Sequence, residues 1–489
     1  MKIAFVSSEV VPFSKTGGLA DVSGALPKFL AALGHEVAVF TPLYRQVKER
    51  FKPKKGKRAI SVPVGAELVT GEVWNGAFPG SKVPVYFIGH DPYFNREGLY
   101  GDEKGDYTDN CSRFVFFSRA VIEALKALKF KPDVIHSNDW QAGLVPVYCR
   151  LAYGADPDIA GAANVYTVHN LAYQGLFWHW DISLLNIGLE HFNYKELEFY
   201  GKINFMKGGI VFADTITTVS PTYAKEIQSD EEYGAGLQGV LKERSEDLVG
   251  VLNGIDYDEW SPEKDKFLPA KYSPADRSGK AECKRALQTE SGFLHKPRTP
   301  LFGMITRLVD QKGLDLVAGI IDEMMKEDLQ LAVLGTGLDK YHVLLTDISK
   351  KYPKKCAAFL KFDNRLAHLI EAGSDMFLMP SRYEPCGLNQ LYSLRYGTVP
   401  VVRAVGGLAD TITDATSGGA ADNANGFSFV LYEPTALLDA VRRALVSYAD
   451  LALWEKIVET GMKQDWSWQR SAREYQGLYG DTVLKKKKR

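Results

Sequence analysis

Short apolar runs that end at polar or glycine residues recur through the first half of the chain. They cover residues 3–6, 36–40, 83–88, 133–136, 164–168 and 215–219. Runs of this length and character are typical of parallel strands that are buried on both faces. The segments between them carry helical patterns: Leu19, Val22, Leu26 and Leu33, for example, share one face of a helix. The alternation of strand and helix predicts an α/β sheet.

A second series of apolar runs follows at residues 301–305, 329–334, 358–362, 376–379 and 399–402. Residues 257–300 lie between the two series and are rich in Pro, Lys, Asp and Ser, which predicts a linker or excursion. We therefore expect two α/β units, at residues 1–255 and 256–463, and a final segment at residues 464–489. Open α/β sheets bind ligands at the carboxyl ends of their strands, so two facing sheets would enclose a deep cleft.

The bulk composition excludes several classes of function. The 489 residues are 45% hydrophobic and 24% charged, which is ordinary for globular domains. A net charge of -1 gives no electrostatic reason to expect a nucleic-acid partner. No apolar stretch approaches the ~20 residues that span a bilayer, and the first strand leaves no room for an export signal. We expect no membrane association.

Five cysteines are spread along the chain without a CxxC spacing. This pattern favours reduced thiols in a cytoplasmic enzyme over disulfides or a zinc site, and we expect neither a metal nor a cofactor. The basic run at residues 485–489 predicts a solvated, disordered tail without a function of its own.

The pentapeptide Gly-Gly-Leu-Ala-Asp occurs twice, at residues 17–21 and 406–410, each time after an apolar run. A glycine turn that opens a helix offers unpaired amides and a partial positive charge, so each turn could hold an anion. Lys15 stands beside Gly17 and Gly18, which suits a phosphate group or sugar oxygens. The spacing matches neither a P-loop nor GxGxxG, and the alternative for Lys15 is a solvated loop lysine.

Charged residues follow two runs of the second series. Arg307 and Lys312 follow the run at residues 301–305, where two cations could neutralise the charge that develops on a departing nucleoside diphosphate. The alternative is a surface pairing of both cations with Asp310 and Asp315. Glu384 follows the run at residues 376–379 and could accept hydrogen bonds from sugar hydroxyls, unless it caps the next helix.

Polar residues also follow runs of the first series: His169 and Asn170 after residues 164–168, and Asp139 after residues 133–136. Alone, His169 could be a structural hydrogen-bonder and Asp139 a helix cap, but together they favour a site. Several aromatic residues in loop-like contexts suit stacking on sugars, although core packing is the alternative for each one. They are Tyr100, Trp140, Tyr173, Phe177, Trp178 and Trp180.

Five motifs, in order and spacing, closely resemble bacterial glycogen synthases and plant starch synthases: residues 15–19, 166–175, 307–312, 384–388 and 406–411. The resemblance extends from Lys2 to about Tyr479. It implies an α/β protein with the GT-B fold, in which two Rossmann-like domains face each other across a deep cleft and a final helix returns to the N-terminal domain. It also implies a retaining glucosyltransferase that moves glucose from ADP-glucose to the non-reducing 4-hydroxyl of an α-1,4-glucan such as glycogen.

The resemblance assigns roles to individual residues. Arg307 and Lys312 would hold the diphosphate, Glu384 the glucose, and His169 would face the reacting sugar; with Asp139, which would orient a donor hydroxyl, these form the catalytic group. The donor-binding candidates are Lys15, Gly17, Gly18, Asn170, Cys386, Gly387, Leu388, Gly407 and Thr411, and the acceptor-binding candidates are Tyr100, Trp140 and Tyr173. Related sugar-nucleotide enzymes often carry a second glutamate eight residues after the first, but Tyr392 stands here and leaves ribose recognition without an identified carboxylate.

Other functions stay open at this point. Within the same fold, the donor could be UDP-glucose or the product a small glucoside such as a disaccharide. A catalytically silent glucan-binding protein would keep the aromatic residues but leave Arg307, Lys312 and Glu384 idle. A phosphorylase-like function is weaker, because no lysine context recommends a pyridoxal Schiff base.

Overall fold

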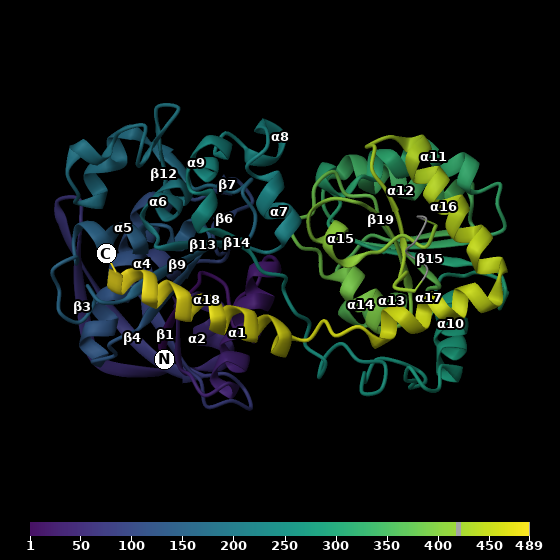
Figure 1. Cartoon of the computed structure of the whole chain (residues 1–489), viewed down its shortest axis with the longest axis horizontal. Coiled ribbons are helices and arrows are strands. Elements are labelled where there is room, and N and C mark those ends of the chain that lie inside the picture. Colours follow the sequence, from purple (N-terminus) through teal and green to yellow (C-terminus); the bar gives the residue numbers. More distant parts are fainter. Residues whose placement is uncertain (417–421, 489) are drawn as a thin grey trace. The chain divides into compact units, whose positions relative to one another are not determined.

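The structure is a computed structural model of the chain and describes residues 1–416 and 422–488 (Figure 1). The chain divides into two compact units. Unit 1 comprises Met1–Gly254 and the segment from Trp468 onward, and unit 2 comprises Ile255–Ser467. The sequence predicted that the first unit ends at residue 255 and the second at residue 463. In the structure these boundaries lie after Gly254 and Ser467.

Unit 1 is built on one large sheet with the strand order β14-β13-β9-β8-β1-β2-β5-β4-β3. Seven of these strands are mutually parallel and include the six that the apolar runs predict. They are β1 (Lys2–Val6), β2 (Glu36–Pro42), β5 (Pro84–Gly89), β8 (Val134–Asn138), β9 (Ala163–Val168), β13 (Thr215–Thr218) and β14 (Leu248–Gly250). The antiparallel strands β3 (Lys54–Val64) and β4 (Glu67–Ala77) were not predicted, because one face of this hairpin is exposed and its apolar residues alternate with polar ones.

Helices and short strands complete unit 1. The helices are α1 (Gly18–Ala32), α2 (Arg45–Phe51), α3 (Asp91–Phe94), α4 (Asn110–Leu128), α5 (Leu144–Leu151), α6 (Phe205–Phe212), α7 (Pro221–Glu226), α8 (Glu231–Gly234), α9 (Gln238–Glu243) and the 3₁₀ turns η1 (Trp140–Ala142), η2 (His179–Leu185), η3 (Leu189–His191) and η4 (Ser245–Asp247). The short strands are β6 (Gly101–Asp102), β7 (Gly105–Asp106), β10 (Leu176–Trp178), β11 (Glu198–Phe199) and β12 (Lys202–Asn204).

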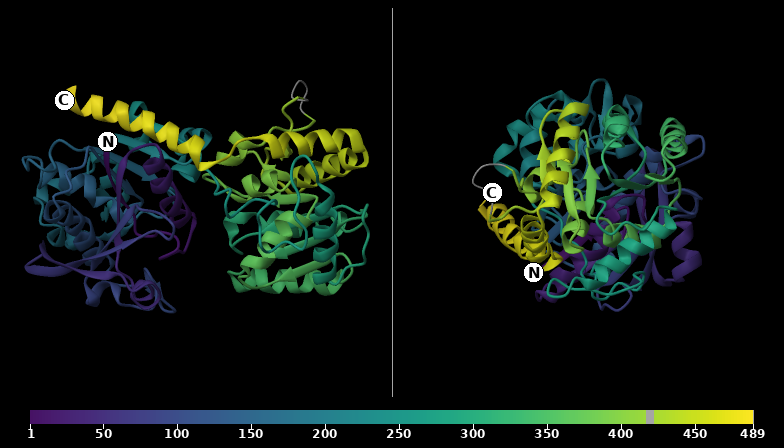
Figure 2. Two further views of the ribbon diagram at one scale, coloured as in Figure 1. Left: turned by 90° about the horizontal axis from the view of Figure 1, so that it is seen from below. Right: turned by 90° about the vertical axis from the view of Figure 1, so that its right-hand side faces the viewer.

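The last helix, α18 (Trp468–Lys488), belongs to unit 1, where it runs as one continuous helix (Figure 2). Tyr475 and Tyr479 are fully buried in the core of unit 1, and the Tyr479 hydroxyl lies 2.7 Å from His136 Nδ1. These contacts explain why a helix with so polar a sequence stays on the sheet.

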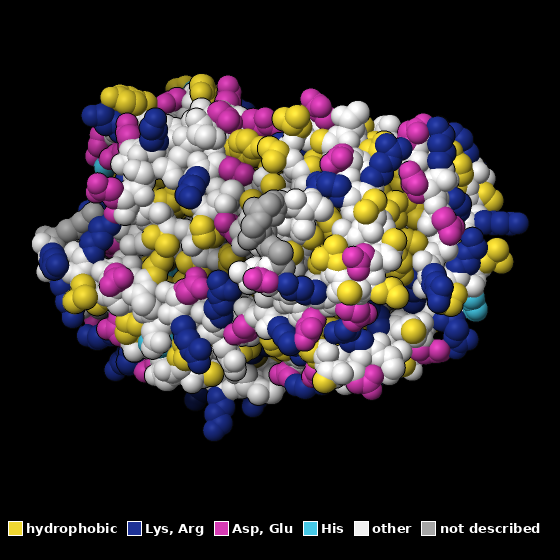
Figure 3. Space-filling view, turned by 45° about the vertical axis from the view of Figure 1, so that its right-hand side comes forward, with side chains coloured by type: hydrophobic (Ala, Val, Ile, Leu, Met, Phe, Trp, Pro, Cys, Tyr) yellow, Lys and Arg dark blue, Asp and Glu magenta, His cyan; other side chains and the backbone are white. Residues whose placement is uncertain are grey.

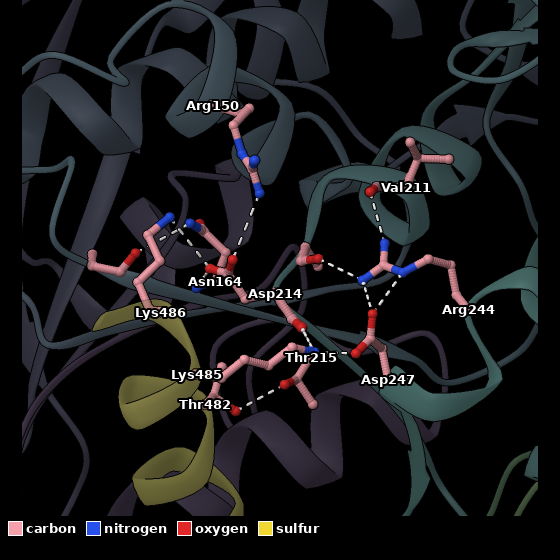
Figure 4. Close-up of polar contacts among 12 residues, drawn as sticks. Arg150, Asn164, Val211, Asp214, Thr215, Arg244, Asp247, Thr482, Lys485 and Lys486 are labelled. Carbon is pink, nitrogen blue, oxygen red and sulfur yellow. Dashed lines mark hydrogen bonds and ion pairs between the residues drawn. The ribbon is translucent and has the colours of Figure 1, made fainter. Parts of the chain in front are cut away.

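The prediction of a disordered basic tail is wrong for residues 485–488, which form the end of α18, while Arg489 lies outside the described residues. Lys485 donates to the Asp214 carbonyl at 2.8 Å and pairs with the Asp247 carboxylate, and Lys486 lies 3.5 Å from the Asp214 carboxylate (Figure 4). Because the two carboxylates belong to another part of unit 1, the charge run alone could not reveal this docking.

Unit 2 holds a six-stranded parallel sheet with the order β17-β16-β15-β18-β19-β20. Its strands are β15 (Leu301–Ile305), β16 (Gln330–Leu334), β17 (Cys356–Phe359), β18 (Met376–Met379), β19 (Val399–Arg403) and β20 (Phe427–Phe429). Its helices are α10 (Ser278–Glu290), α11 (Leu314–Met324), α12 (Asp339–Lys351), α13 (Asn364–Gly373), α14 (Asn389–Arg395), α15 (Gly406–Thr411), α16 (Pro434–Ala449), α17 (Leu451–Lys463) and the 3₁₀ turn η5 (Asp310–Lys312).

Helix α10 lies inside the stretch that the sequence identified as a linker, and it packs against α13. Its lysines explain the misleading composition. The Lys280 ammonium donates to the carbonyls of Ala372 and Tyr396, and Lys284 pairs with Asp375 at 2.6 Å. Burial lowers the pKa of Lys280 to about 8. A lysine-rich segment is therefore a folded part of unit 2.

Positive and negative side chains are interspersed on the face drawn in Figure 3, as the net charge of -1 leads one to expect. Of the helices in the described residues, none combines the length and the apolar character needed to cross a membrane. All five cysteines are buried, and none of them forms a disulfide.

Candidate active site

In unit 2, Lys312 and Glu384 meet at the carboxyl end of the sheet. Lys312 ends the turn η5 after β15, and Glu384 lies in the loop after β18, the neighbouring strand. Lys312 Nζ donates to Glu384 Oε2 at 2.6 Å, and Ser381 Oγ donates to the same oxygen at 2.8 Å. The two paired side chains are only 17% and 8% exposed. Glu384 is therefore the partner of a catalytic candidate and not a helix cap.

Arg307 leaves the end of β15 and is exposed. The alternative in which Asp310 and Asp315 pair with Arg307 and Lys312 is wrong for Lys312, whose partner is Glu384. Asp310 pairs with Lys340 instead, and Asp315 accepts from the Tyr432 hydroxyl at 2.6 Å. Among the described residues, no ion pair or hydrogen bond involves the Arg307 guanidinium, so this cation is available to a ligand.

The second glycine pair is required by close packing of two loops. Gly406 has φ +45°, and a Cβ there would lie 2.0 Å from the Glu384 carbonyl oxygen. A Cβ on Gly407 would lie 2.0 Å from the Cys386 carbonyl oxygen, and the Gly407 amide donates to the carbonyls of Glu384 and Pro385 at 3.2 Å. The glycines thus seat the start of α15 on the loop that carries Glu384.

The other donor-binding candidates of unit 2 surround this loop. Cys386 is buried, Gly387 has φ +70°, and Leu388 directly precedes α14. The Thr411 hydroxyl is used within the fold, because it donates to the Gly407 carbonyl at 2.6 Å. This contact gives Thr411 a structural role.

Position 392 is used for packing in unit 2. The Tyr392 ring stacks on Trp260 at 3.8 Å, and Trp260 stacks on His368 at 3.9 Å. Where related sugar-nucleotide enzymes often carry a second glutamate, this protein has Tyr392, the outer ring of an aromatic stack.

The sequence analysis placed Phe362 at the end of a buried run, residues 358–362, but β17 ends at Phe359 and Phe362 lies beyond it as a candidate that the pattern concealed. It follows β17, at the carboxyl edge of the sheet, and 85% of its side chain is exposed. An exposed aromatic ring at the carboxyl edge of the sheet can stack on a flat ligand. Only the strand order shows that it lies on the same edge as Arg307, since β17, β16 and β15 are neighbours.

In unit 1, the first glycine turn is bound to a buried glutamate that the sequence analysis also missed. Glu9 follows β1 and is 3% exposed. Its Oε2 accepts from the amides of Thr16 at 2.5 Å and Gly17 at 3.2 Å, and its Oε1 accepts from Thr16 Oγ1 at 2.5 Å. These two amides are therefore satisfied by a carboxylate of the protein, and they are not open for a phosphate.

The remaining groups of this turn point elsewhere. Lys15 is half-exposed and pairs with Asp21 in the first turn of α1 at 2.7 Å. Burial raises the pKa of Asp21 even though Lys15 acts in the opposite direction. Gly18 is exposed, and a Cβ on Gly17 or Gly18 would meet no atom within 4 Å, so there is space for a ligand beside this turn, although the Gly17 amide itself is bonded to Glu9.

His169 is held as a neutral imidazole. Burial lowers its pKa to about 3. Asn138 Nδ2 donates to the Val6 carbonyl at 3.0 Å, which leaves Asn138 Oδ1 as an acceptor 2.9 Å from His169 Nε2. His169 Nε2 is therefore the protonated nitrogen, and Nδ1 carries a lone pair.

Asp139 lies directly beside His169. Its Oδ1 accepts from the His169 amide at 2.8 Å, and its side chain does not cap the turn η1. Asp139 has φ +54°, a left-handed conformation that is strained for a residue other than glycine. Burial, with a smaller contribution from the charge of Glu9, raises its pKa to about 7 despite the hydrogen bonds from the His169 and Asn170 amides. Asp139 thus orders the His169–Asn170 turn.

The three acceptor-binding candidates differ in how open they are. Tyr173 is 55% exposed. Trp140 is half-buried, with its ring centroid 4.9 Å from that of Phe114, and the Tyr100 hydroxyl donates to Glu9 Oε1 at 2.8 Å. Tyr173 is accordingly free to stack on a sugar, whereas Trp140 and Tyr100 are packed into the wall of unit 1.

Within the described residues, no three His, Cys, Asp or Glu side chains are grouped as metal ligands. The two cations Arg307 and Lys312 follow β15 at the carboxyl end of the unit 2 sheet, where they suit a diphosphate. The protein thus has two α/β units. One carries cations at the carboxyl edge of its sheet, and the other carries a neutral histidine, a carboxylate and a glycine turn. This combination is typical of sugar-nucleotide glycosyltransferases of the GT-B class.

Comparison with known proteins narrows this class. A family model described as the starch synthase catalytic domain matches residues 2–243, and one described as glycosyl transferases group 1 matches residues 289–461. The chain is 49% identical to a glycogen synthase of Koribacter versatilis over 98% of both chains, and 47% identical to a glycogen synthase of Thermosipho africanus over the whole of both. The protein belongs to the glycogen synthase and starch synthase family of glucosyltransferases.

Solved structures agree with this assignment. The catalytic domain of starch synthase IV from Arabidopsis thaliana, bound to ADP and acarbose, matches 99% of the chain with a TM-score of 0.89 and 33% identity. A sucrose-phosphate synthase from Thermosynechococcus elongatus matches with a TM-score of 0.59 and 16% identity, which shows a shared fold alone. The expected fold class and family are therefore confirmed.

Proposed function

We propose that the protein transfers glucose from ADP-glucose to the non-reducing 4-hydroxyl of an α-1,4-glucan with retention of configuration. The glycogen synthases and the ADP- and acarbose-bound starch synthase IV support this donor and acceptor. The observation that carries the proposal is the order of groups along the unit 2 sheet edge. Phe362 follows β17, Arg307 follows β15, Glu384 follows β18 and Gly406 follows β19, in the sequence in which these strands lie.

That order matches the parts of a sugar nucleotide laid across the strands. Neighbouring strands lie about 4.8 Å apart, so the edge from β17 to β19 is long enough for an extended nucleotide sugar. The base would stack on Phe362, the diphosphate would lie at Arg307 and Lys312, and the glucose would lie over the loop at Glu384 and Gly387. Glu384 Oε2 is taken by Lys312 and Ser381, which leaves Oε1 to accept from glucose hydroxyls.

The chemistry follows from the charges of these groups. Departure of ADP leaves negative charge on the diphosphate, which the Arg307 and Lys312 cations would stabilise without reorganising. Positive charge develops on the glucosyl ring, and the carboxylate of Asp139 would stabilise it once ionised. His169 is neutral and would contribute hydrogen bonding but no charge. With no enzymic nucleophile invoked, retention requires attack from the face that the leaving group departs, with a phosphate oxygen taking the acceptor proton.

We further propose that the two units act as an acceptor-side and a donor-side domain that close around the donor, because water must be excluded from a reactive glucosyl group. The exposed Gly18 and Lys15 would meet the donor from unit 1. Asn170 belongs to the same side, and Tyr173 would stack on the glucan. The free, buried cysteines support a reducing, cytoplasmic compartment for this reaction.

The direct test is transfer of labelled glucose to glycogen from ADP-glucose and, separately, from UDP-glucose, with a chelator present in both assays. We expect rapid transfer from ADP-glucose and little from UDP-glucose. Preference for UDP-glucose would overturn the donor, and no transfer from either donor by a folded sample would overturn the proposed activity.

A further inference from the structure

Glu9 connects two parts of unit 1 that lie far apart in the sequence. Besides the three bonds from Thr16 and Gly17, Glu9 Oε1 accepts from the Tyr100 hydroxyl at 2.8 Å. Ser8 Oγ lies 2.8 Å from the same hydroxyl, and since Tyr100 donates to the carboxylate, Ser8 is the donor in that contact. The glycine turn and Tyr100 thus meet on one carboxylate.

Burying an ionised carboxylate costs free energy of desolvation unless hydrogen bonds or an opposite charge compensate for it. Glu9 is 3% exposed, and no Lys or Arg among the described residues pairs with it. All four of its partners are donors, so the acceptor-only carboxylate matches its surroundings. Hydrogen bonds to a charged group are roughly twice as strong as neutral ones. The four hydrogen bonds offset the desolvation cost of this anion, and they also fix the positions of its donors.

The two sides that Glu9 joins have different expected substrates. The turn at residues 14–18 carries the exposed Lys15 and Gly18, the donor-side candidates. Tyr100 packs against Trp140, with ring centroids 6.1 Å apart, and these are acceptor-side candidates. No hydrogen bond between Thr16 and Tyr100 is present in the described residues, so their polar connection runs through Glu9.

We propose that Glu9 is a positioning residue that couples the donor-side glycine turn to the acceptor-side Tyr100, so that donor and acceptor binding become energetically linked. This proposal rests on the proposed function. A shift of Tyr100 on acceptor binding would move one oxygen of the carboxylate and, through the other, the amides of Thr16 and Gly17. Glu9 touches neither reacting group in this scheme and acts only through the residues that it holds.

The test is a double-mutant cycle between two residues that share Glu9 but do not bond to each other. Thr16→Val removes one hydroxyl donor and Tyr100→Phe removes the other, each with little change of shape. We expect each to lower kcat/KM for the donor at least 10-fold, from the strength of a hydrogen bond to a charged group. The double variant should lose about as much as the worse single variant, a coupling of about 10-fold. The same cycle in a Glu9→Gln background should be additive.

Controls separate positioning from loss of fold. Thr16→Ser keeps the hydroxyl and should restore the activity that Thr16→Val loses, while Ser61→Ala removes a hydroxyl bonded to Thr70, on the β3–β4 hairpin, and should change nothing. Thr16→Ser should keep the parent's melting temperature, whereas Thr16→Val, which removes a bond to the buried carboxylate, should melt several degrees lower but stay folded at the assay temperature.

An additive cycle in the Glu9 protein, with an active parent, would overturn the coupling. So would the same coupling in the Glu9→Gln background, because the link would then bypass the carboxylate. A parent protein that transfers no glucose at all would count instead against the proposed function, so the two failures are distinguishable.

Discussion

Replacing Lys312 by methionine should lower both stability and turnover, for two separable reasons. Lys312 Nζ lies 2.6 Å from Glu384 Oε2, and the two side chains are 17% and 8% exposed. Removing one partner of a buried ion pair leaves an uncompensated charge, at a cost of about 3–5 kcal/mol. For a domain of about 200 residues, 1 kcal/mol corresponds to about 2–4 °C, so the lower bound predicts a loss of about 6–12 °C in Tm.

The catalytic loss has another origin and magnitude. Loss of one charge that stabilises the departing diphosphate should lower kcat by about 100- to 1,000-fold. Lys312→Met combined with Glu384→Gln removes the isolated carboxylate, so most of the stability should return while kcat stays low. Arg307→Ala is the matched control: the side chain is exposed and takes part in no ion pair in the described structure, so kcat should fall with a change of about 0.5 kcal/mol or less in stability.

Thermal unfolding and initial rates of labelled glucose transfer measure the two effects on the same samples. Lys312→Met with an unchanged Tm, or a double variant no more stable than the single one, would refute the account of the buried pair. Full turnover in both Lys312→Met and Arg307→Ala would refute the role of these cations in stabilising the diphosphate.

Further predictions concern single groups. Phe362→Ala should raise the donor KM about 10-fold, a loss of about 1.4 kcal/mol of base stacking, without changing Tm or the acceptor KM; an unchanged donor KM would exclude stacking. Tyr173→Ala should raise the acceptor KM and spare the donor KM, which kinetics with each substrate varied in turn will show. The pKa of Asp139 rises from 3.8 to about 7 on folding, so the protein should lose stability as the pH rises from about 4 to 7, and turnover should increase above pH 7, where Asp139 is ionised. Asp139→Asn should remove both pH dependences. A pH–rate profile like that of the parent in this variant would assign the ionisation to another group. Burial acts to raise the pKa of Asp247, but hydrogen bonds from Lys485 and Arg244 hold that pKa below its usual value. Lys485→Met should therefore lower the stability near pH 7 and change it little at a pH below the Asp247 pKa, which unfolding measured as a function of pH will test.

Where local chemistry dominates, the sequence by itself determined the outcome. Apolar runs such as residues 3–6 and 301–305 are typical of buried parallel strands, and each is a parallel strand in the structure. The polar residues that follow those runs therefore had to lie at the carboxyl edges of the sheets. This reasoning placed Arg307, Lys312 and Glu384 in one unit, and the five motifs identified the family.

Tertiary structure alone decided which of these residues are partners. Lys312 and Glu384 are 72 residues apart, and no local pattern indicates that they form one buried ion pair. Glu9 looked like an ordinary loop residue until the chain brought Tyr100 to it from 91 positions away. The basic C-terminus looked disordered because the carboxylates that hold it, Asp214 and Asp247, are distant in sequence. Sequence periodicity reports which face of an element is apolar, whereas pairing between buried charges depends on distances that only the packed chain sets.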